Sequence, residues 1–273
     1  MYEKLVSTLR QWSKNYEEDN GSPDFLALEA ADALEEAQKN ELQWKKMYDS
    51  ISQEVNDYHK WINKEYNKIP NIFKREEFGN NKLIEGQYSI PELEYLSNSQ
   101  WIWTEKVDGT NIRIIWDGHE VTFGGRTSKA QIPAHLVNRL NELFSGTNKE
   151  EIFEQHFGDT PVILFGEGYG EKIQKGGGLY GSVDFILFDV FCNGVWLRRD
   201  DVEDIAKYFE IKVVPIVGRG DLKEAVEYIR NHPQSFLKND ELEGIVCRPS
   251  IELNDRRGNR IIVKIKCRDF QKE

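Results

Sequence analysis

The stretch WIWTEKVDGTNIRIIW, residues 101–116, carries the clearest fold signal in this chain of 273 residues. Two runs rich in Trp, Ile and Thr flank an Asp-Gly pair, a pattern typical of two β-strands joined by a tight turn. Lys106 lies at the end of the first run. A lysine that is buried or placed beside other cations loses its proton readily and becomes a nucleophile. An ordinary hairpin whose turn contains Asp-Gly is the alternative interpretation of this stretch alone.

Strand-like runs continue along the rest of the chain and are separated by Gly- and Asn-rich turns. They are EVTFGG, PVILFGEG, DFILFDVF, VWLRR, KVVPIV, GIVCRP and RIIVKIK. Helical stretches are expected among them at Ile132–Leu143 and Leu222–Asn231. Many strands with few and irregularly spaced helices predict an α+β fold of mostly antiparallel sheets with flanking helices, not a doubly wound parallel sheet.

The first 69 residues predict an all-helical N-terminal module. Ser22-Pro23-Asp24 has the composition of a helix start, and no Gly or Pro follows until Pro70. Apolar residues recur at intervals of three and four, so the stretch is expected to form one long helix, or two with a break near residues 49–50. Its apolar stripe is interpreted as a layer that packs on the rest or as a dimer seam. A specific protein partner is the alternative.

Composition and charge exclude several classes of protein. With 36 basic and 47 acidic side chains the net charge is −11, but residues near the C-terminus are locally basic, so phosphate binding is not excluded. Charges occur throughout the first twenty residues, and no apolar run has the length of a membrane span. Cys192, Cys247 and Cys267 are far apart, which argues against disulfides and a zinc site. A cytoplasmic protein is expected, or one of the host cytoplasm if the chain is viral.

Four more motifs place charged or aromatic residues within or beside strands: LFGEGYG, FILFDVF, LEGIVCRP and IIVKIKC. The residues concerned are Glu167, Phe188, Asp189, Glu243, Lys264 and Lys266. Because strand side chains alternate, the two lysines of the last motif share one face. Two lysines on one face of an otherwise apolar strand face either solvent or an anion such as a phosphate.

These motifs, in this order, resemble those of the covalent nucleotidyltransferases, which include polynucleotide ligases and mRNA capping enzymes. The sequence KVDGTN looks like the RNA ligase 2-like branch, because DNA ligases and capping enzymes usually have Arg at the place of Asn111. Glu243-Gly244 is ligase-like, whereas capping enzymes typically have Asp-Gly there. Arg126 falls where this branch keeps an arginine. The resemblance extends from about Ile72 to Phe270.

The resemblance implies a nucleotidyltransferase (ligase adenylation domain) fold over residues 70–273, preceded by the helical module over residues 1–69. It implies an ATP-dependent RNA ligase that joins 5′-phosphate and 3′-hydroxyl ends of RNA, in single strands or a nicked duplex. Lys106 would attack the α-phosphate of ATP to give lysyl-AMP. AMP would then pass to the 5′-phosphate, and the 3′-hydroxyl would displace it.

The resemblance also assigns roles to the other candidates. Lys264 and Lys266 would bind the α-phosphate and favour the neutral form of the attacking amine. Asp189 and Glu243 would hold Mg²⁺ or Mn²⁺. The residues expected to contact the nucleotide are Glu105, Asn111 and Arg126 (the last two at phosphates), Glu167 (ribose), Phe188 (adenine) and Glu243.

Two departures from the family pattern keep other functions open. Asp108 stands where the RNA ligase branch often has His, and Asp is common there in DNA ligases. The sequence ends seven residues after Lys266, so no C-terminal OB-fold is expected. A ligase for nicked DNA or RNA–DNA hybrids, a capping guanylyltransferase, and a nucleotide- or RNA-binding module without sealing activity are the alternatives. The Gly-rich run at residues 176–178 is interpreted as a mobile surface loop and not a P-loop.

Overall fold

The computed structural model describes residues 2–20, 25–78 and 80–270, so the predicted helix start at Ser22–Asp24 lies outside the described residues. The chain forms two compact units, Met1–His59 and Lys60–Glu273. They are called the helical unit and the sheet unit. Among the described residues, no helix has both the length and the apolar composition needed to cross a membrane.

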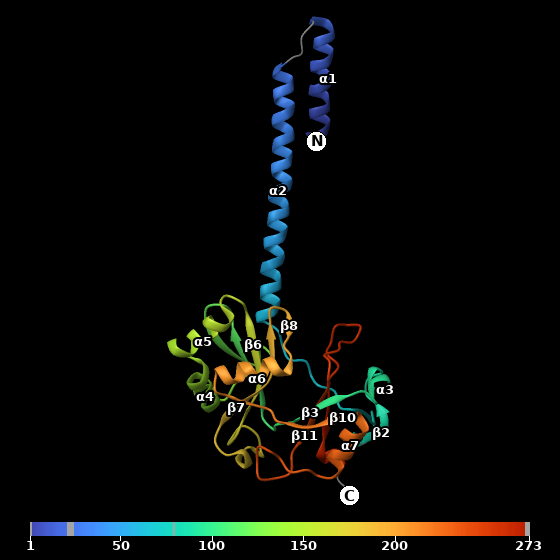
Figure 1. Ribbon diagram of the computed structural model, residues 1–273, viewed down its shortest axis with the longest axis vertical. Coiled ribbons are helices and arrows are strands. Elements are labelled where there is room, and N and C mark those ends of the chain that lie inside the picture. The colour runs from blue at the N-terminus through green and yellow to red at the C-terminus, as the bar shows by residue number, and fades with distance from the viewer. Residues whose placement is uncertain (1, 21–24, 79, 271–273) are drawn as a thin grey trace. The chain divides into compact units, whose positions relative to one another are not determined.

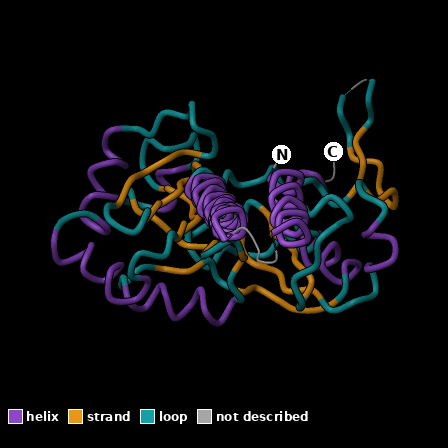
Figure 2. The backbone as a smooth tube through the Cα atoms, turned by 90° about the horizontal axis from the view of Figure 1, so that it is seen from above, coloured by secondary structure: helices purple, strands orange, loops and turns teal. Residues whose placement is uncertain are grey.

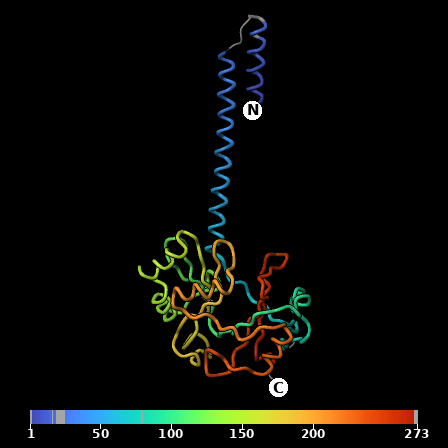
Figure 3. The backbone as a smooth tube through the Cα atoms, viewed as in Figure 1, coloured from blue at the N-terminus to red at the C-terminus, as the bar shows by residue number. Residues whose placement is uncertain are grey.

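The helical unit contains α1 (Tyr2–Asn20) and most of α2 (Phe25–Ile62), which run antiparallel (Figure 3). The second helix is continuous through residues 49–50, so the possible break there does not occur. Small residues of α2, Ala27 and Ala31, are buried within this unit. The guanidinium of Arg10 on α1 lies 2.9 Å from a carboxylate of α2. Further along, α2 exposes a row of large apolar side chains, namely Trp44, Met47, Tyr48, Ile51 and Val55.

The helix ends at Ile62, seven residues before the predicted boundary, and residues 64–70 are non-helical. A helical conformation is disfavoured directly before a proline, here Pro70. Tertiary contacts also draw this segment into the sheet unit. The amide of Lys264 donates to Pro70 O at 2.9 Å, and the amide of Ile72 donates to Lys264 O at 3.0 Å. The domain boundary therefore lies nearer residue 60 than residue 70.

The sheet unit contains a four-stranded antiparallel sheet in the order β10-β3-β11-β12 (Figures 1 and 2). Its strands are β3 (Trp101–Glu105), β10 (Ile216–Gly220), β11 (Gly244–Pro249) and β12 (Val263–Lys266). All five residues of β3 are buried, because the strand lies in the middle of the sheet and is covered on both faces.

A six-stranded sheet has the order β5-β4-β6-β7-β8, with β9 paired to β7. Its pairings are antiparallel except for the parallel pair β7–β9. Its strands are β4 (Thr110–Trp116), β5 (Val121–Gly125), β6 (Val162–Tyr169), β7 (Asp184–Cys192), β8 (Val195–Trp196) and β9 (Lys212–Val213). A separate hairpin-like pair consists of β1 (Phe73–Arg75) and β2 (Leu83–Tyr88).

Helices cover the outer face of each sheet (Figure 1). The α-helices of this unit are α3 (Glu92–Leu96), α4 (Ala134–Phe144), α5 (Thr147–Phe157), α6 (Arg199–Tyr208) and α7 (Leu222–Arg230). The two predicted helices are present as α4 and α7. The sequence pattern did not predict α5 and α6. Most of their residues are charged or polar, and only a few positions, such as Phe153 and Val202, are buried.

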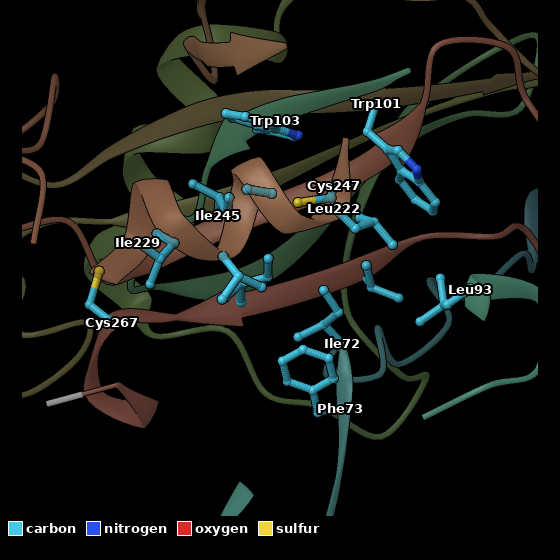
Figure 4. Close-up of a cluster of buried hydrophobic side chains, with 14 of the residues drawn as sticks. Ile72, Phe73, Leu93, Trp101, Trp103, Leu222, Ile229, Ile245, Cys247 and Cys267 are labelled. Carbon is cyan, nitrogen blue, oxygen red and sulfur yellow. The ribbon is translucent and has the colours of Figure 1, made fainter. Parts of the chain in front are cut away.

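Each sheet has its own apolar core. One face of the four-stranded sheet packs against α7 and α3 around Trp101 and Trp103, as Figure 4 shows. Cys247 and Cys267 lie in this core as small apolar residues, and all three cysteines are free thiols. The six-stranded sheet packs its outer face against α4, α5 and α6 around Phe144 and Phe153. The predicted α+β fold of mostly antiparallel sheets with flanking helices is therefore confirmed.

A buried ion cluster joins the inner faces of the two sheets. Asp189 on β7 has no exposed surface. Its carboxylate accepts from Arg248 on β11 at 2.6 Å, from Arg260 at 2.9 Å and from the Tyr66 hydroxyl at 2.5 Å. Burial alone would raise the pKa of Asp189, but Arg248 and Arg260 outweigh it and hold the pKa at about 2. The carboxylate is therefore ionised at neutral pH and neutralises two buried guanidinium groups.

Replacing Asp189 with Asn should destabilise the protein by about 3–5 kcal/mol, because the buried Arg248 loses its main counter-ion and Arg260 loses one of its two carboxylate partners. Urea unfolding at neutral pH measures this loss. The contribution of Asp189 is fully present above about pH 4, where the unfolded carboxyl is ionised, and it disappears as the pH falls towards about 2. The difference between Asp189→Asn and the wild type should shrink over that window.

Asp204→Asn is a matched control for this experiment, because it removes an exposed ion pair with Lys207 on α6. It should leave the urea midpoint close to that of the wild type. Equal midpoints for Asp189→Asn and Asp204→Asn would contradict the assigned role of the buried cluster.

Candidate functional site

A cavity of about 230 Å³ opens on the inner face of the four-stranded sheet. We call it the lysine pocket. Its walls come from the ends of β3, β4, β6, β7, β11 and β12, and from the segment before Pro70. The lining residues are Tyr66, Asn67, Lys68, Ile69, Thr104, Glu105, Lys106, Val107, Asn111, Arg126, Glu167, Phe188, Val214, Val246, Arg248 and Lys264. Seven of the ten predicted site residues are in this set, whereas Asp189, Glu243 and Lys266 are not.

Lys106 lies directly after β3, and backbone hydrogen bonding fixes its position. Its amide donates to Gly244 O at 2.9 Å. Its side-chain amine donates to one oxygen of Glu243 at 2.5 Å, and Lys266 donates to the other oxygen at 2.8 Å. Burial alone would raise the pKa of Glu243, but the two lysines outweigh burial and lower it. Glu243 and Lys266 thus lie against Lys106 from just outside the pocket lining.

Lys264 is half-buried and points into the pocket from β12. Burial, together with the positive charges of Lys266, Lys106 and Lys68 and opposed by Glu243, lowers the pKa of Lys264 to about 8. Among the described residues Lys264 has no carboxylate within ion-pair distance. An amine that is surrounded by cations and lacks a counter-ion is suited to bind an anion.

Two polar side chains face each other across the pair β4–β6, where Asn111 is opposite Glu167. The Oδ1 atom of Asn111 is buried and has no hydrogen-bond partner in the described structure. Burial raises the pKa of Glu167 to about 8. Lys106 opposes this shift, and Glu243 and Asp108 add to it. An unsatisfied buried polar atom such as Asn111 Oδ1 costs free energy, and a bound ligand can satisfy it.

The turn after Lys106 requires glycine. A Cβ at Gly109 would lie 2.3 Å from Gly168 O and 2.8 Å from the side chain of Glu167. The absence of a side chain at Gly109 therefore lets the turn approach β6. The Gly-rich run forms a 3₁₀ turn, Gly177–Tyr180, whose Tyr180 hydroxyl accepts a hydrogen bond from the amide of Asp108.

Aromatic and aliphatic side chains form one wall of the pocket. Phe188 on β7 contacts Tyr66 edge to face, with ring centroids 5.0 Å apart. Val107 and Val214 add aliphatic surface. A flat apolar wall opposite a row of cations has the chemistry of a site for a nucleotide, because a base has two apolar faces and phosphates are anionic.

Glu105 has a different environment from the one expected for a nucleotide ligand. Its side chain is buried, and it accepts hydrogen bonds from the Ser235 hydroxyl and, at 2.9 Å, from the amide of Phe236. Glu105 therefore fastens the loop at residues 235–238 to the end of β3. Its contribution to the pocket lining is to hold that loop in place.

The surroundings of Asp189 also differ from those expected for a ligand of a metal ion. Its oxygens are held by two arginines and a tyrosine, which occupy the positions that a cation would take. Within the described residues there is no cluster of three or more His, Cys, Asp or Glu side chains that could hold a metal. The site therefore fits an ion that keeps water and phosphate ligands, as Mg²⁺ commonly does, with Glu243 as the nearby carboxylate.

Sequence reasoning missed the segment before Pro70. Tyr66, Asn67, Lys68 and Ile69 line the pocket, although they were assigned to the helical module. Pro70 is the sequence feature that could have predicted this non-helical segment, because the residue before a proline favours an extended conformation.

Comparison with known proteins identifies the class of this fold and site. The sequence model of the RNA ligase family matches residues 99–266. This match covers more than half of the chain and includes the predicted motifs from Glu105 to Lys266. The chain belongs to the RNA ligase family.

Solved structures of an RNA ligase from Naegleria gruberi show the same fold. A mutant with ATP and Mn is 20% identical, covers 74% of this chain and 60% of its own length, and has a TM-score of 0.52. A mutant with AMP and Mn is also 20% identical, covers 74% and 61%, and has a TM-score of 0.51. A structure with PPi is 23% identical, covers 65% and 52%, and has a TM-score of 0.50. This chain thus aligns with about half to three fifths of the length of those proteins.

The raised pKa of Glu167 predicts that the folding stability of the ligand-free protein depends on pH. The unfolded carboxyl ionises near pH 4, but the folded one ionises near pH 8, so stability falls as the pH rises through that window. Glu167→Gln should therefore be more stable than the wild type at pH 8, by at most about 1.4 kcal/mol for each pH unit of the window. Thermal unfolding of both proteins near pH 4 and pH 8 measures the difference.

The control for this experiment is Glu120→Gln, at an exposed turn where no comparable burial occurs. Its stability relative to the wild type should change little between the two pH values. If Glu167→Gln behaves like this control, Glu167 is not held in the protonated form.

Proposed function

We propose that this chain is an ATP-dependent RNA ligase that joins 5′-phosphate and 3′-hydroxyl ends through a lysyl-AMP intermediate. The observation that carries the proposal is the position of Lys106. Its amine lies in a pocket with an aromatic wall, beside unpaired cations, and is held by the carboxylate of Glu243. Membership of the RNA ligase family and the fold shared with ligases seen with ATP or AMP support it.

The first step forms one bond and breaks one bond. The ammonium of Lys106 must first lose its proton to solvent, and Glu243, which accepts a hydrogen bond from this amine, orients it. The neutral amine attacks the α-phosphorus of ATP and forms a P–N bond. The bond between the α-phosphorus and the bridging oxygen of the β-phosphate breaks, and pyrophosphate leaves with that electron pair.

Residues of the lysine pocket orient the nucleotide for this attack. Phe188 offers its ring to adenine. Glu167, beside Gly168 and close to Gly109, is placed to bond the ribose hydroxyls. Arg126 and Lys264, which both line the pocket, would bind phosphate oxygens, and Lys264 would stabilise charge that develops at the α-phosphate.

A divalent ion bound with ATP would neutralise phosphate charge and favour departure of pyrophosphate. Glu243 would hold it, through water. If Glu243 held such an ion, it would hold Lys106 and Lys266 less tightly, and both amines would be free to contact the substrate. Mg²⁺ or Mn²⁺ suits oxygen ligands of this kind.

The second and third steps use the same pocket. An oxygen of the RNA 5′-phosphate attacks the phosphorus of lysyl-AMP, the P–N bond breaks, and Lys106 takes up a proton. The RNA 3′-hydroxyl then attacks the 5′-phosphorus, and AMP leaves as a phosphodiester forms. We assign these steps to the sheet unit, with residues 1–59 as a separate helical module.

Lys106→Ala should abolish covalent labelling by ATP that is radioactive at the α-phosphate, because no other residue is proposed to form the P–N bond. Lys106→Arg should fail equally, since a guanidinium stays protonated and cannot attack. Labelling is read on a denaturing gel after incubation with ATP and Mg²⁺. A labelled Lys106→Ala protein would show that another side chain is the nucleophile.

The same experiment separates the remaining functions when the labelled protein is given a second substrate. Transfer of AMP to 5′-phosphorylated RNA followed by joining supports the proposal. Transfer of AMP only to nicked DNA would indicate a DNA ligase in place of an RNA ligase. Labelling by GTP instead of ATP would indicate a capping guanylyltransferase. If the wild type takes no label, the remaining interpretation is a binding module without sealing activity.

Lys264 should make ATP binding pH-dependent. Its protonated form binds phosphate, and its pKa of about 8 in the free protein means that this form is lost as the pH rises above about 8. The ATP affinity of the wild type should therefore fall above that pH. The ATP affinity of Lys264→Arg should not change with pH in this range, because the guanidinium stays charged. Binding is measured calorimetrically with Lys106 in place and an ATP analogue whose α,β-bridging oxygen is replaced by carbon, so that lysyl-AMP cannot form.

Lys264→Ala should also slow lysyl-AMP formation by about 10²–10³, the usual effect of losing one preorganised group at developing charge. Lys82→Ala, which removes a lysine outside the pocket lining, is the control and should keep the wild-type rate. A Lys264→Ala protein with wild-type labelling kinetics would remove this residue from the site.

A further inference from the structure

A second cavity, of about 480 Å³, lies between the four-stranded sheet and the start of α6. Four arginines line it, which distinguishes it from the other cavities of the sheet unit. They are Arg198, Arg199, Arg219 and Arg248. We call this cavity the arginine groove.

The groove lies on the same sheet face as the lysine pocket. Ile102 on β3 is opposite Arg219 on β10 and Arg248 on β11, so these three side chains form a row across three strands. Two positions along, Thr104 is opposite Val246, and both line the lysine pocket. Since side chains two apart share a face, the row continues directly into that pocket.

Arg248 belongs to both cavities and separates them. Its guanidinium is held by Asp189, so it is a fixed part of the wall. Its Nε atom is buried and has no hydrogen-bond partner in the described structure. The groove and the pocket are therefore two parts of one surface, joined at a rigid arginine.

Of the other three arginines in the lining, one has hydrogen-bond partners on its side chain and two have no carboxylate partner in the described structure. Arg199 donates to Glu203 at 2.6 Å and to Val214 O at 2.8 Å. Arg198 and Arg219 are exposed, and neither pairs with a carboxylate among the residues that the structure describes. Two guanidinium groups without a carboxylate partner in one groove fit a ligand with more than one anionic group.

The acidic residues of the groove do not cancel this charge. Glu252 lies 2.5 Å from Arg260, outside the groove, and Asp200 is the other carboxylate in the lining. Arg248 and Arg199 already pair with Asp189 and Glu203, so the groove's available positive charge comes from Arg198 and Arg219. Ile251, which is 74% exposed, and Ile102 add apolar surface between the charges.

We propose that the arginine groove binds backbone phosphates of the RNA strand whose end reacts in the lysine pocket. An RNA strand combines repeated phosphates with flat apolar bases, which matches free arginines beside exposed isoleucine. Arginine is well suited to phosphate because its planar fork donates two hydrogen bonds at once. This inference rests on the proposed function, because it takes RNA as the substrate.

The test uses the full chain with Arg198→Ala and Arg219→Ala combined. Covalent labelling by ATP should be unchanged, because neither side chain lines the lysine pocket. The affinity for a short, 5′-phosphorylated, single-stranded RNA should fall. If each arginine neutralises one phosphate, the slope of log affinity against log salt should become shallower by about 1.4, which is 0.7 for each phosphate on a single strand.

Two controls make the loss specific. Arg256→Ala combined with Arg257→Ala removes two exposed arginines that do not line the groove, and it should keep more of the affinity and of the salt slope. Replacing Arg198 and Arg219 with Lys should restore the salt slope, because the charge returns. The joining rate of the Ala variant should recover at saturating RNA, since only binding is impaired.

The outcomes distinguish this inference from the proposed function. A wild type that takes no AMP label would overturn the proposed function. A labelled groove variant with the affinity and salt slope of the wild type would overturn the inference alone, as would equal losses in the Arg256/Arg257 control. Competition by an acidic polypeptide but not by RNA would assign the groove to a protein partner and also overturn it.

Discussion

The carboxylate of Asp189 is the contact on which the arrangement of the two sheets depends. It extends from β7 of one sheet and neutralises Arg248 of the other, with Arg260 and Tyr66 completing its hydrogen bonds. The lysine pocket lies between the same two sheet faces, with Phe188 from one sheet and Lys264 from the other. The distance between the aromatic wall and the lysines is therefore set by an ion cluster that does not itself face the nucleotide.

Lys106, the proposed nucleophile, is held by its neighbours. Glu243 accepts hydrogen bonds from Lys106 and Lys266, one at each oxygen. Under the proposed function, a divalent ion or a phosphate would compete for these partners. Glu167 is the complementary case, because burial keeps it protonated near neutral pH until a ligand offers hydrogen bonds. The substrate thus supplies what each group lacks in the free protein.

Much of this architecture could be predicted from sequence because strands leave a simple alternating pattern. The alternation in residues 261–267 placed Lys264 and Lys266 on one face, and the hairpin pattern placed Lys106 at a strand end. The sequence could not reveal that Asp189 faces two arginines, because Arg248 and Arg260 are about 60 and 70 residues away and pair with it only through the sheet-to-sheet packing. The hydrogen-bond partners of Glu105 could not be predicted for the same reason, since Ser235 and Phe236 lie on a distant loop. The charged helices α5 and α6 were missed because their apolar faces are narrow.

The backbone bonds between residues 70–72 and Lys264 have a consequence for how the protein is made. They join the first segment of the sheet unit to its last strand, across nearly its whole length. Contacts between such distant segments form late, because the long intervening loop must close first. During synthesis, Lys106 leaves the ribosome well before Lys264 does. The nascent chain therefore carries Lys106, the proposed nucleophile, without the complete lysine pocket until β12 has joined the sheet.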